Sequence, residues 1–170
     1  MDSSVPVLIT EATAADVDAF ARFLNEVWTE AGPDAPGFAG VTDAVMTELT
    51  ARDAMLARLE DPDRDVFLAR EGDRVVGFAA TRSMGDEVVE LAGIIVAPSA
   101  KCRGVGAALV EAARLRAVAN GHSTMMVRTE ITNEGALAFY RHRGFTPVRT
   151  TVEDVDGVAV DVWELEARLT

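Results

Sequence analysis

The sequence predicts an α+β fold, for three reasons. β-branched runs with period-two spacing recur along the chain, and longer segments between them carry apolar residues at helical spacing. Two hairpin signals in the middle of the chain, EGDR and MGDE, predict a meander of three strands. The second half then alternates strands with helices. With 170 residues, 49% of them apolar, we expect a single domain over residues 1–170.

The first part of the chain is expected to form one strand and two helices. The strand covers Val7 to Ala12, and Thr13 then caps a helix that runs to about Glu30. The segment from Ala31 to Gly40 contains two prolines and three glycines, and it is either a lid over a site or a connector. A second amphipathic helix is expected from Thr42 to about Glu60.

The rest of the chain holds the meander and the alternating segment. The meander strands are expected at residues 65–70, 75–83 and 88–96. A helix over 104–120 follows, with Gly121 as its C′ residue. The remaining elements are a strand at 124–129, a helix at 133–143, and two final strands at 148–152 and 158–165.

Composition excludes several function classes. The net charge of −12 disfavours nucleic-acid binding, and it either attracts cationic molecules or only keeps the protein soluble. No apolar run is long enough to span a bilayer, and the acidic N-terminus lacks the basic region of a signal peptide. The lone Cys102 suits a reducing compartment, so we expect a cytoplasmic protein. Neither His122 nor His142 belongs to a zinc-like cluster, and no metal is expected.

A glycine loop between the third meander strand and the next helix has the chemistry of an anion site. A helix N-terminus offers unpaired N–H groups, and Gly104 and Gly106 let the backbone approach a ligand. Lys101 and Arg103 add positive charge. The loop lacks the Lys-Ser/Thr of a nucleotide-hydrolysing P-loop, and Leu109 replaces the third glycine of a dinucleotide fingerprint. An ordinary tight turn explains the same two glycines.

Two segments carry a family resemblance. The stretch VAPSAKCRGVGAALV resembles the acyl-CoA-binding motif of the GNAT superfamily of N-acyltransferases, Gln/Arg-x-x-Gly-x-Gly/Ala. The stretch NEGALAFYRHRGF is similar to the second signature of that family, Asn-x-x-Ala-x-x-x-Tyr-x-x-x-Gly-Phe. The positions that match are Lys101, Gly104 and Gly106 in the first motif and Asn133, Ala136, Tyr140, Gly144 and Phe145 in the second.

The resemblance implies a fold and an activity. The implied fold has a twisted, mostly antiparallel sheet of about seven strands, flanked by about four helices and splayed between the fourth and fifth strands. The implied reaction is transfer of an acetyl group from acetyl-CoA to a primary amine of a small molecule or peptide, by direct attack. The alternatives are a CoA-binding regulatory or interaction module without turnover, and an unrelated phosphate-binding domain. Members of the family often pair, so a homodimer is also expected.

The resemblance also implies the residues that bind the co-substrate. They are Ile94, Ile95, Val96, Lys101, Cys102, Arg103, Gly104, Val105, Gly106, Ala107, Asn133 and Tyr140. Two of them depart from the family pattern. Lys101 replaces a glutamine or arginine and is a point donor instead of a fork, and Cys102 stands where glycine is common.

Two residues are predicted to act on protons. Tyr140, the only tyrosine, occupies the family position of the acid for the leaving thiolate and is the candidate for that role; the alternative is an aromatic residue that only packs on Ala136, four residues back on the helix. Glu90 is the candidate base, because period-two alternation places it on the apolar face of Ile94 and Val96; the other reading is a solvated carboxylate.

Three smaller expectations complete the site. Gly93, inside the same strand, is either a bulge that frees backbone amides or an ordinary strand glycine. Asn133 caps its helix or contacts the pantetheine arm. No motif specifies the acceptor site, for which the candidates are Trp28, Asp34, Phe38, Glu153, Asp154 and Asp156.

Overall fold

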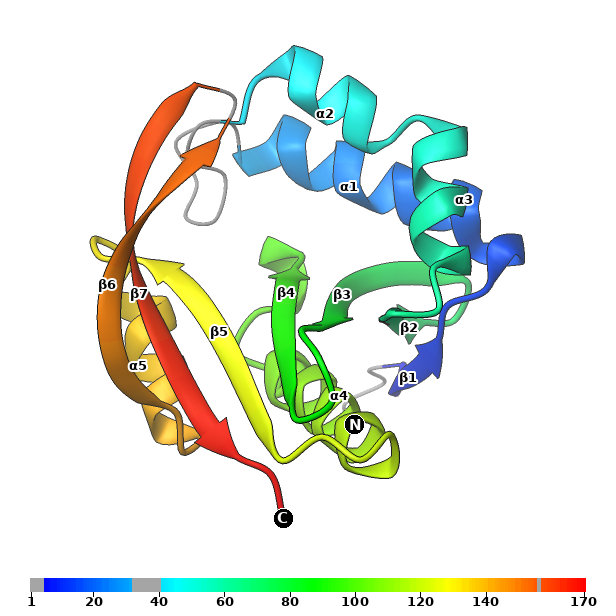
Figure 1. Ribbon diagram of the computed structural model, residues 1–170. Helices are drawn as coiled ribbons and strands as arrows, with labels where there is room; N and C mark the ends of the chain where they lie inside the picture. The colour runs from blue at the N-terminus through cyan, green and yellow to red at the C-terminus, as the bar shows by residue number, and fades with distance from the viewer. Residues whose placement is uncertain (1–4, 32–40, 156) are drawn as a thin grey trace.

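Seven strands form one mixed sheet in the order β1–β2–β3–β4–β5–β7–β6. The computed structural model describes residues 5–31, 41–155 and 157–170 (Figure 1). The strands are β1 (Val7–Glu11), β2 (Arg64–Glu71), β3 (Arg74–Ser83), β4 (Val88–Val96), β5 (Thr124–Glu130), β6 (Thr146–Val155) and β7 (Val158–Arg168). Every neighbouring pair is antiparallel except β4–β5, so the predicted α+β fold with a mostly antiparallel sheet is confirmed.

Helices cover both faces of the sheet. They are α1 (Val17–Ala31), α2 (Asp43–Leu49), α3 (Arg52–Glu60), α4 (Val105–Ala119) and α5 (Glu134–His142), with short 3-10 turns at Ala14–Asp16 and Pro98–Ala100. Helices α1 to α3 lie on one side of the sheet, and α4 and α5 lie on the other (Figure 1). We refer to these two sides as the α1 face and the α4 face.

The prediction of one helix from Thr42 to about Glu60 is wrong in one respect, because this segment forms two helices. Helix α2 ends at the C-cap Thr50, and Ala51 has a ψ of 135°, an extended conformation that breaks the helical path before α3. Neither proline nor glycine marks this break in the sequence. Each of the two short helices then buries one methionine, Met46 from α2 and Met55 from α3.

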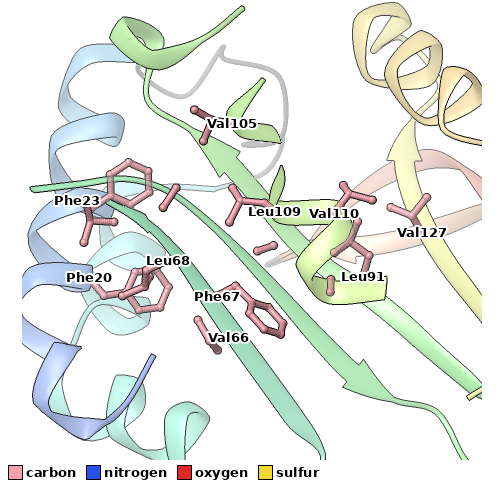
Figure 2. Packing of buried hydrophobic residues seen from close by; sticks show 14 of the residues in the cluster. Phe20, Phe23, Val66, Phe67, Leu68, Leu91, Val105, Leu109, Val110 and Val127 are labelled. Carbon is pink, nitrogen blue, oxygen red and sulfur yellow. The ribbon is translucent and has the colours of Figure 1, made fainter. Parts of the chain in front are cut away.

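The apolar core fills the space on both faces of β2 and β3. Phe20 and Phe23 of α1 lie on one side of these strands, and Val105 and Leu109 of α4 lie on the other (Figure 2). The ring centroids of Phe20 and Phe78 are 4.9 Å apart, which places Phe78 on the α1 face. Burial on both faces explains why β2 is apolar at four consecutive positions, residues 66–69, instead of alternating.

The expected splay between the fourth and fifth strands is present. β4 and β5 pair only from Val88↔Thr124 to Leu91↔Val127, although β4 continues to Val96 and β5 continues to Glu130. Past Leu91 the two strands separate, and β5 pairs with β7 alone. The sheet is therefore continuous at one end and open at the other, and the opening faces the loop that leads into α4.

Candidate active site at the splay

The first part of the site is the unpaired edge of β4. Ala97 donates its N–H to the Val76 carbonyl at 2.8 Å, which makes this a hydrogen-bonded pair of the β3–β4 ladder. Antiparallel ladders alternate, so the next hydrogen-bonded pair is Ile95 with Phe78. The N–H and C=O groups of Ile94 and Val96 therefore point away from β3, into the splay.

A β-bulge lies just before this edge. Ala80 pairs with Gly93 and Thr81 pairs with Leu91, so Ala92 is the extra residue on β4. The bulge predicted at Gly93 thus falls beside it. A Cβ on Gly93 would lie 3.4 Å from the Phe78 ring, so that the lack of a side chain also leaves room for this aromatic residue.

The bulge overturns one prediction about Glu90. Because one residue is inserted, the alternation of faces reverses, and Glu90 shares the α1 face with Arg82 while Ile94 and Val96 lie on the α4 face. Its environment is not apolar. The Glu90 carboxylate is buried with 9% of its side chain exposed, and it accepts hydrogen bonds from Arg82 at 2.6 Å and from Arg128 at 3.1 Å.

The second part of the site is the N-terminus of α4. The first hydrogen bond inside this helix runs from the Ala108 N–H to the Gly104 carbonyl at 3.0 Å. The N–H groups of Val105, Gly106 and Ala107 therefore have no acceptor inside the helix. A cavity of about 350 Å³ opens beside them, and it is lined by Val5, Pro6, Val7, Arg103, Gly104, Val105 and Ala108. Three free amides beside a hollow fit the diphosphate of a nucleotide-like ligand.

The two motif glycines serve different purposes. Gly104 has a φ of 77°, and a Cβ added there would meet no atom within 4 Å, so this position requires glycine for its left-handed conformation. At Gly106 an added Cβ would lie 3.1 Å from the Phe139 ring and 3.8 Å from Val96. Gly106 therefore allows α5 to approach α4 closely. The sequence analysis predicted only that this glycine lets the backbone approach a ligand.

The two cations of the loop, Lys101 and Arg103, differ in their ion pairing. Lys101 and Cys102 are both exposed, and Cys102 is the one non-glycine residue with positive φ, at 62°, among the described residues. Arg103 forms an ion pair with Glu71 of β2. Of the two loop cations, Lys101 has no ion pair with any residue of the described chain.

Helix α5 delivers the second motif to the site. The Asn133 side chain accepts a hydrogen bond from the Ala136 N–H at 3.0 Å, which confirms its expected capping role. At the other end Phe145 donates its N–H to the Tyr140 carbonyl, and Gly144 has a φ of 88°. This is a Schellman ending, and it packs the Phe145 ring on the Tyr140 ring with centroids 5.5 Å apart.

The Tyr140 side chain is buried among aromatic rings. Its ring contacts Phe139 and Phe145, and 5% of the residue is exposed. Its hydroxyl has no hydrogen-bond partner in the described part of the chain, yet it is not fully closed off from solvent. Burial raises the pKa of the Tyr140 phenol well above its ordinary value near 10. The phenol is therefore protonated, and able to donate a hydrogen bond, throughout the physiological pH range.

The acceptor candidates fall into two groups. Asp34, Phe38 and Asp156 lie outside the described residues. Trp28 donates to the Asp43 carboxylate at 2.7 Å and so joins α1 to α2. Glu153 forms an ion pair with Arg128 of β5, and Asp154 accepts from the Gly157 N–H in the turn between β6 and β7.

Comparison with known proteins settles the family. The acetyltransferase (GNAT) family model matches residues 21–145. The chain belongs to this family. No curated protein matches the chain closely.

Solved structures agree with this assignment at the level of fold. A probable acetyltransferase from Staphylococcus epidermidis superposes with a TM-score of 0.80 at 16% identity, over 97% of this chain and 100% of that one. The PaiA N-acetyltransferase from Thermoplasma acidophilum, solved in complex with coenzyme A, gives 0.72 at 17% identity over 96% and 99%. The ribosomal-protein-S18-alanine N-acetyltransferase from Escherichia coli gives 0.72 at 16% identity over 97% and 95%. The chain therefore has the GNAT fold with its seven-stranded open sheet.

Two further observations bear on ligands. No helix among the described residues is long and apolar enough to cross a membrane. Within the same residues, no group of three histidine, cysteine or acidic side chains is placed to hold a metal ion.

Proposed function

We propose that this protein is an N-acetyltransferase, which transfers an acetyl group from acetyl-CoA to a primary amine of a small molecule or peptide by direct attack. One observation carries the proposal. The unpaired edge of β4, with the amides of Ile94 and Val96, opens beside the free N-terminus of α4. Main-chain donors are thus available at two separated points, as a long thioester ligand with a diphosphate end requires.

The chain's own residues then have defined tasks. The amides of Val105 to Ala107 bind the diphosphate, and Lys101 adds the charge of a cation that has no ion pair in the described chain. The Ile94 or Val96 N–H donates to the thioester carbonyl oxygen and stabilises the negative charge that develops there. When bound, coenzyme A supplies the activated acyl group.

Tyr140 is proposed to donate a hydrogen bond to the leaving sulfur. Its raised pKa keeps the phenol protonated, and its hydroxyl has no competing partner in the described chain. The same high pKa makes full proton transfer to a thiolate unfavourable, because a thiol has a pKa near 8.5. We therefore propose that the Tyr140 hydroxyl keeps its proton and donates a hydrogen bond to the developing thiolate. The proton that the attacking amine releases is the one that finally converts the thiolate to the free thiol.

The amine acceptor is proposed in general terms only. Glu153 pairs with Arg128 and Asp154 accepts from the Gly157 N–H, and both residues also remain at the surface, so these contacts assign neither of them to the acceptor. We propose a cytoplasmic location for the reaction, which a single unpaired cysteine suits, and we propose that residues 1–170 act as one catalytic domain.

The test combines binding with turnover. Calorimetry with acetyl-CoA measures affinity, and thiol release is then followed with polyamines, aminoglycosides, amino acids and basic peptides as acceptors. We expect saturable binding and release that depends on one acceptor class. Tyr140→Phe keeps the ring contacts and should lower kcat by roughly 10- to 100-fold at unchanged affinity, because it removes one hydrogen bond to a developing charge. Binding without turnover for any amine would support the CoA-binding module instead, and no heat at millimolar acetyl-CoA would refute the whole proposal.

A further inference from the structure

A row of ion pairs crosses the sheet on the α1 face. Arg82 of β3 contacts Glu90 of β4, which contacts Arg128 of β5, and Arg128 contacts Glu164 of β7 at 3.5 Å. Glu164 also contacts Arg149 of β6 at 2.6 Å. Charges of opposite sign therefore alternate over five adjacent strands. We call these residues the ionic ladder.

The ladder crosses the sheet at the base of the splay. The last paired residues of β4 and β5 are Leu91 and Val127, so Glu90 lies one residue inside the paired stretch and Arg128 is the first residue of β5 beyond it. The Glu90–Arg128 ion pair is thus a side-chain link between the two strands at the point where their backbone pairing ends. Beyond it, β4 carries the unpaired amides of Ile94 and Val96.

Burial makes this link strong. The side chains of Glu90 and Glu164 are 9% and 4% exposed, and 27% of the Arg128 side chain is exposed. An ion pair shielded from water is screened weakly, and removing one partner leaves a buried charge without compensation. Arg128 also touches Glu153 at 3.4 Å, so three carboxylates restrain one guanidinium. The link is rigid because its members have little freedom to reorient.

We propose that Glu90 and Arg128 are positioning residues, which fix the separation of β4 and β5 at the base of the splay and thereby hold the Ile94 and Val96 amides where the acyl thioester needs them. This inference rests on the proposed acetyltransferase function. It assigns Glu90 a task other than that of general base. Each carboxylate oxygen already accepts a hydrogen bond from a guanidinium, so the carboxylate is held between two cations of the sheet.

The test uses Glu90→Gln, Arg128→Met and the conservative Arg128→Lys in the full chain. The first readout is hydrogen exchange of the paired amides at residues 88–91 and 124–127, which we call the seam. This readout does not depend on activity. We expect exchange there to accelerate about tenfold or more in Glu90→Gln and Arg128→Met, since a hydrogen bond to a charged group has this magnitude. Amides of β1 and β2 should be unchanged, whereas a general loss of stability would accelerate every amide.

The second readout is kinetic. We expect kcat to fall roughly 10- to 100-fold in both variants, because a small misplacement of reacting groups has effects of this size. KM for acetyl-CoA should change little, since the α4 N-terminus binds its diphosphate elsewhere. Arg128→Lys keeps the charge and should recover part of kcat. The shape of the pH–rate profile should be the same as that of the unaltered protein.

Matched controls separate the link from ion pairs in general. Asp16→Asn removes a pair with Arg70 of β2 whose side chains are 21% and 19% exposed, near the β1 edge of the sheet and away from the splay. Glu164→Gln removes the next carboxylate along the ladder and leaves Glu90–Arg128 in place. We expect Asp16→Asn to leave seam exchange and kcat unchanged, and Glu164→Gln to have a smaller effect than Glu90→Gln.

Several results would overturn the inference. Unchanged seam exchange in Glu90→Gln and Arg128→Met would show that the pair does not hold the strands. Loss of the acidic limb of the pH–rate profile in Glu90→Gln, with seam exchange unchanged, would instead establish Glu90 as the base. Failure of the proposed function is recognised separately, because the unaltered protein would then neither bind acetyl-CoA in calorimetry nor release thiol, while the seam measurement still decides the link.

Discussion

The two halves of the sheet are stabilised in different ways on the α1 face. In the first half, Phe78 of β3 packs on Phe20 and Phe23 of α1, and apolar contacts continue through the core (Figure 2). In the second half, β5, β7 and β6 carry the charged side chains of the ionic ladder on that face. The first half is stabilised by hydrophobic burial, and the second adds ion pairs between strands.

This difference explains why the site lies between the two halves of the sheet. The halves meet in a short stretch of parallel pairing, and further contacts join them on both faces of the sheet. Glu90 pairs with Arg128 on the α1 face, and we call this the Glu90 junction. On the α4 face Gly106 of α4 lies against Phe139 of α5, the Gly106 junction, and Arg114 of α4 also donates to the Arg143 carbonyl at 2.8 Å. Between the two junctions, β4 keeps unpaired backbone groups that a continuous sheet would have consumed.

The largest expected effect tests the apolar half. Leu68 of β2 is fully buried, so Leu68→Ala should lower the free energy of unfolding by about 2–5 kcal/mol through lost burial and a cavity. Chemical denaturation monitored by circular dichroism measures the change. Glu164→Gln in the charged half should lower it by less, about 1–3 kcal/mol, because Arg128 keeps its contact with Glu90. An equal or greater loss in Glu164→Gln would contradict the difference between the halves.

An intermediate effect is expected at the Gly106 junction. Gly106→Ala forces a methyl group against the Phe139 ring, and the overpacking should destabilise the protein by about 1–3 kcal/mol, partly offset by the better helix propensity of alanine. Thermal unfolding provides the measurement. Phe139→Leu shortens the opposing side chain, so the double variant should recover most of the loss.

Gly104→Ala is the matched control for that junction. Its methyl group meets open space, and the cost arises from the positive φ, so Phe139→Leu should not rescue it. Similar rescue of both glycine variants would mean that Gly106 does not contact α5 in the way the structure indicates.

The smallest effect concerns the alkaline stability of the second half. The folded protein raises the pKa of Tyr140, so it retains a proton that the unfolded chain loses near pH 10. Stability from this group is complete below pH 10 and decreases as pH rises above it, by about 1 kcal/mol between pH 10 and pH 11. Tyr140→Phe should lack this decrease. Ultraviolet titration of the only tyrosine checks the shift directly, and ionisation at the ordinary pKa would refute it.

Local patterns explain how much of the site was predictable. The Asn133 cap, the positive φ of Gly144 and the contact of Phe145 with Tyr140 depend on neighbours within one helix and its ending. The free N-terminus of α4 after Gly104 is local in the same sense. Such features are readable because the interacting groups are only a few residues apart.

The features that escaped prediction depend on partners far apart in the sequence. Nothing in the local pattern tells that β7 lies between β5 and β6, and only this order brings Glu164 between Arg128 and Arg149. The bulge at Ala92 moved Glu90 to the opposite face, because one inserted residue inverts the alternation. The helix break at Ala51 likewise has no glycine or proline to announce it.

Short segments of the sequence were sufficient to indicate the family, the alternation of strands and helices, and the two motifs that supply a helix N-terminus and a tyrosine. Helix caps, turns and glycine conformations depend on adjacent residues, so they can be predicted from such segments. The separation of β4 and β5 after Leu91, the guanidinium groups that face Glu90 and the aromatic ring against Gly106 became evident from the folded chain. These are contacts between distant segments, and they exist only when the sheet order and register bring the segments together.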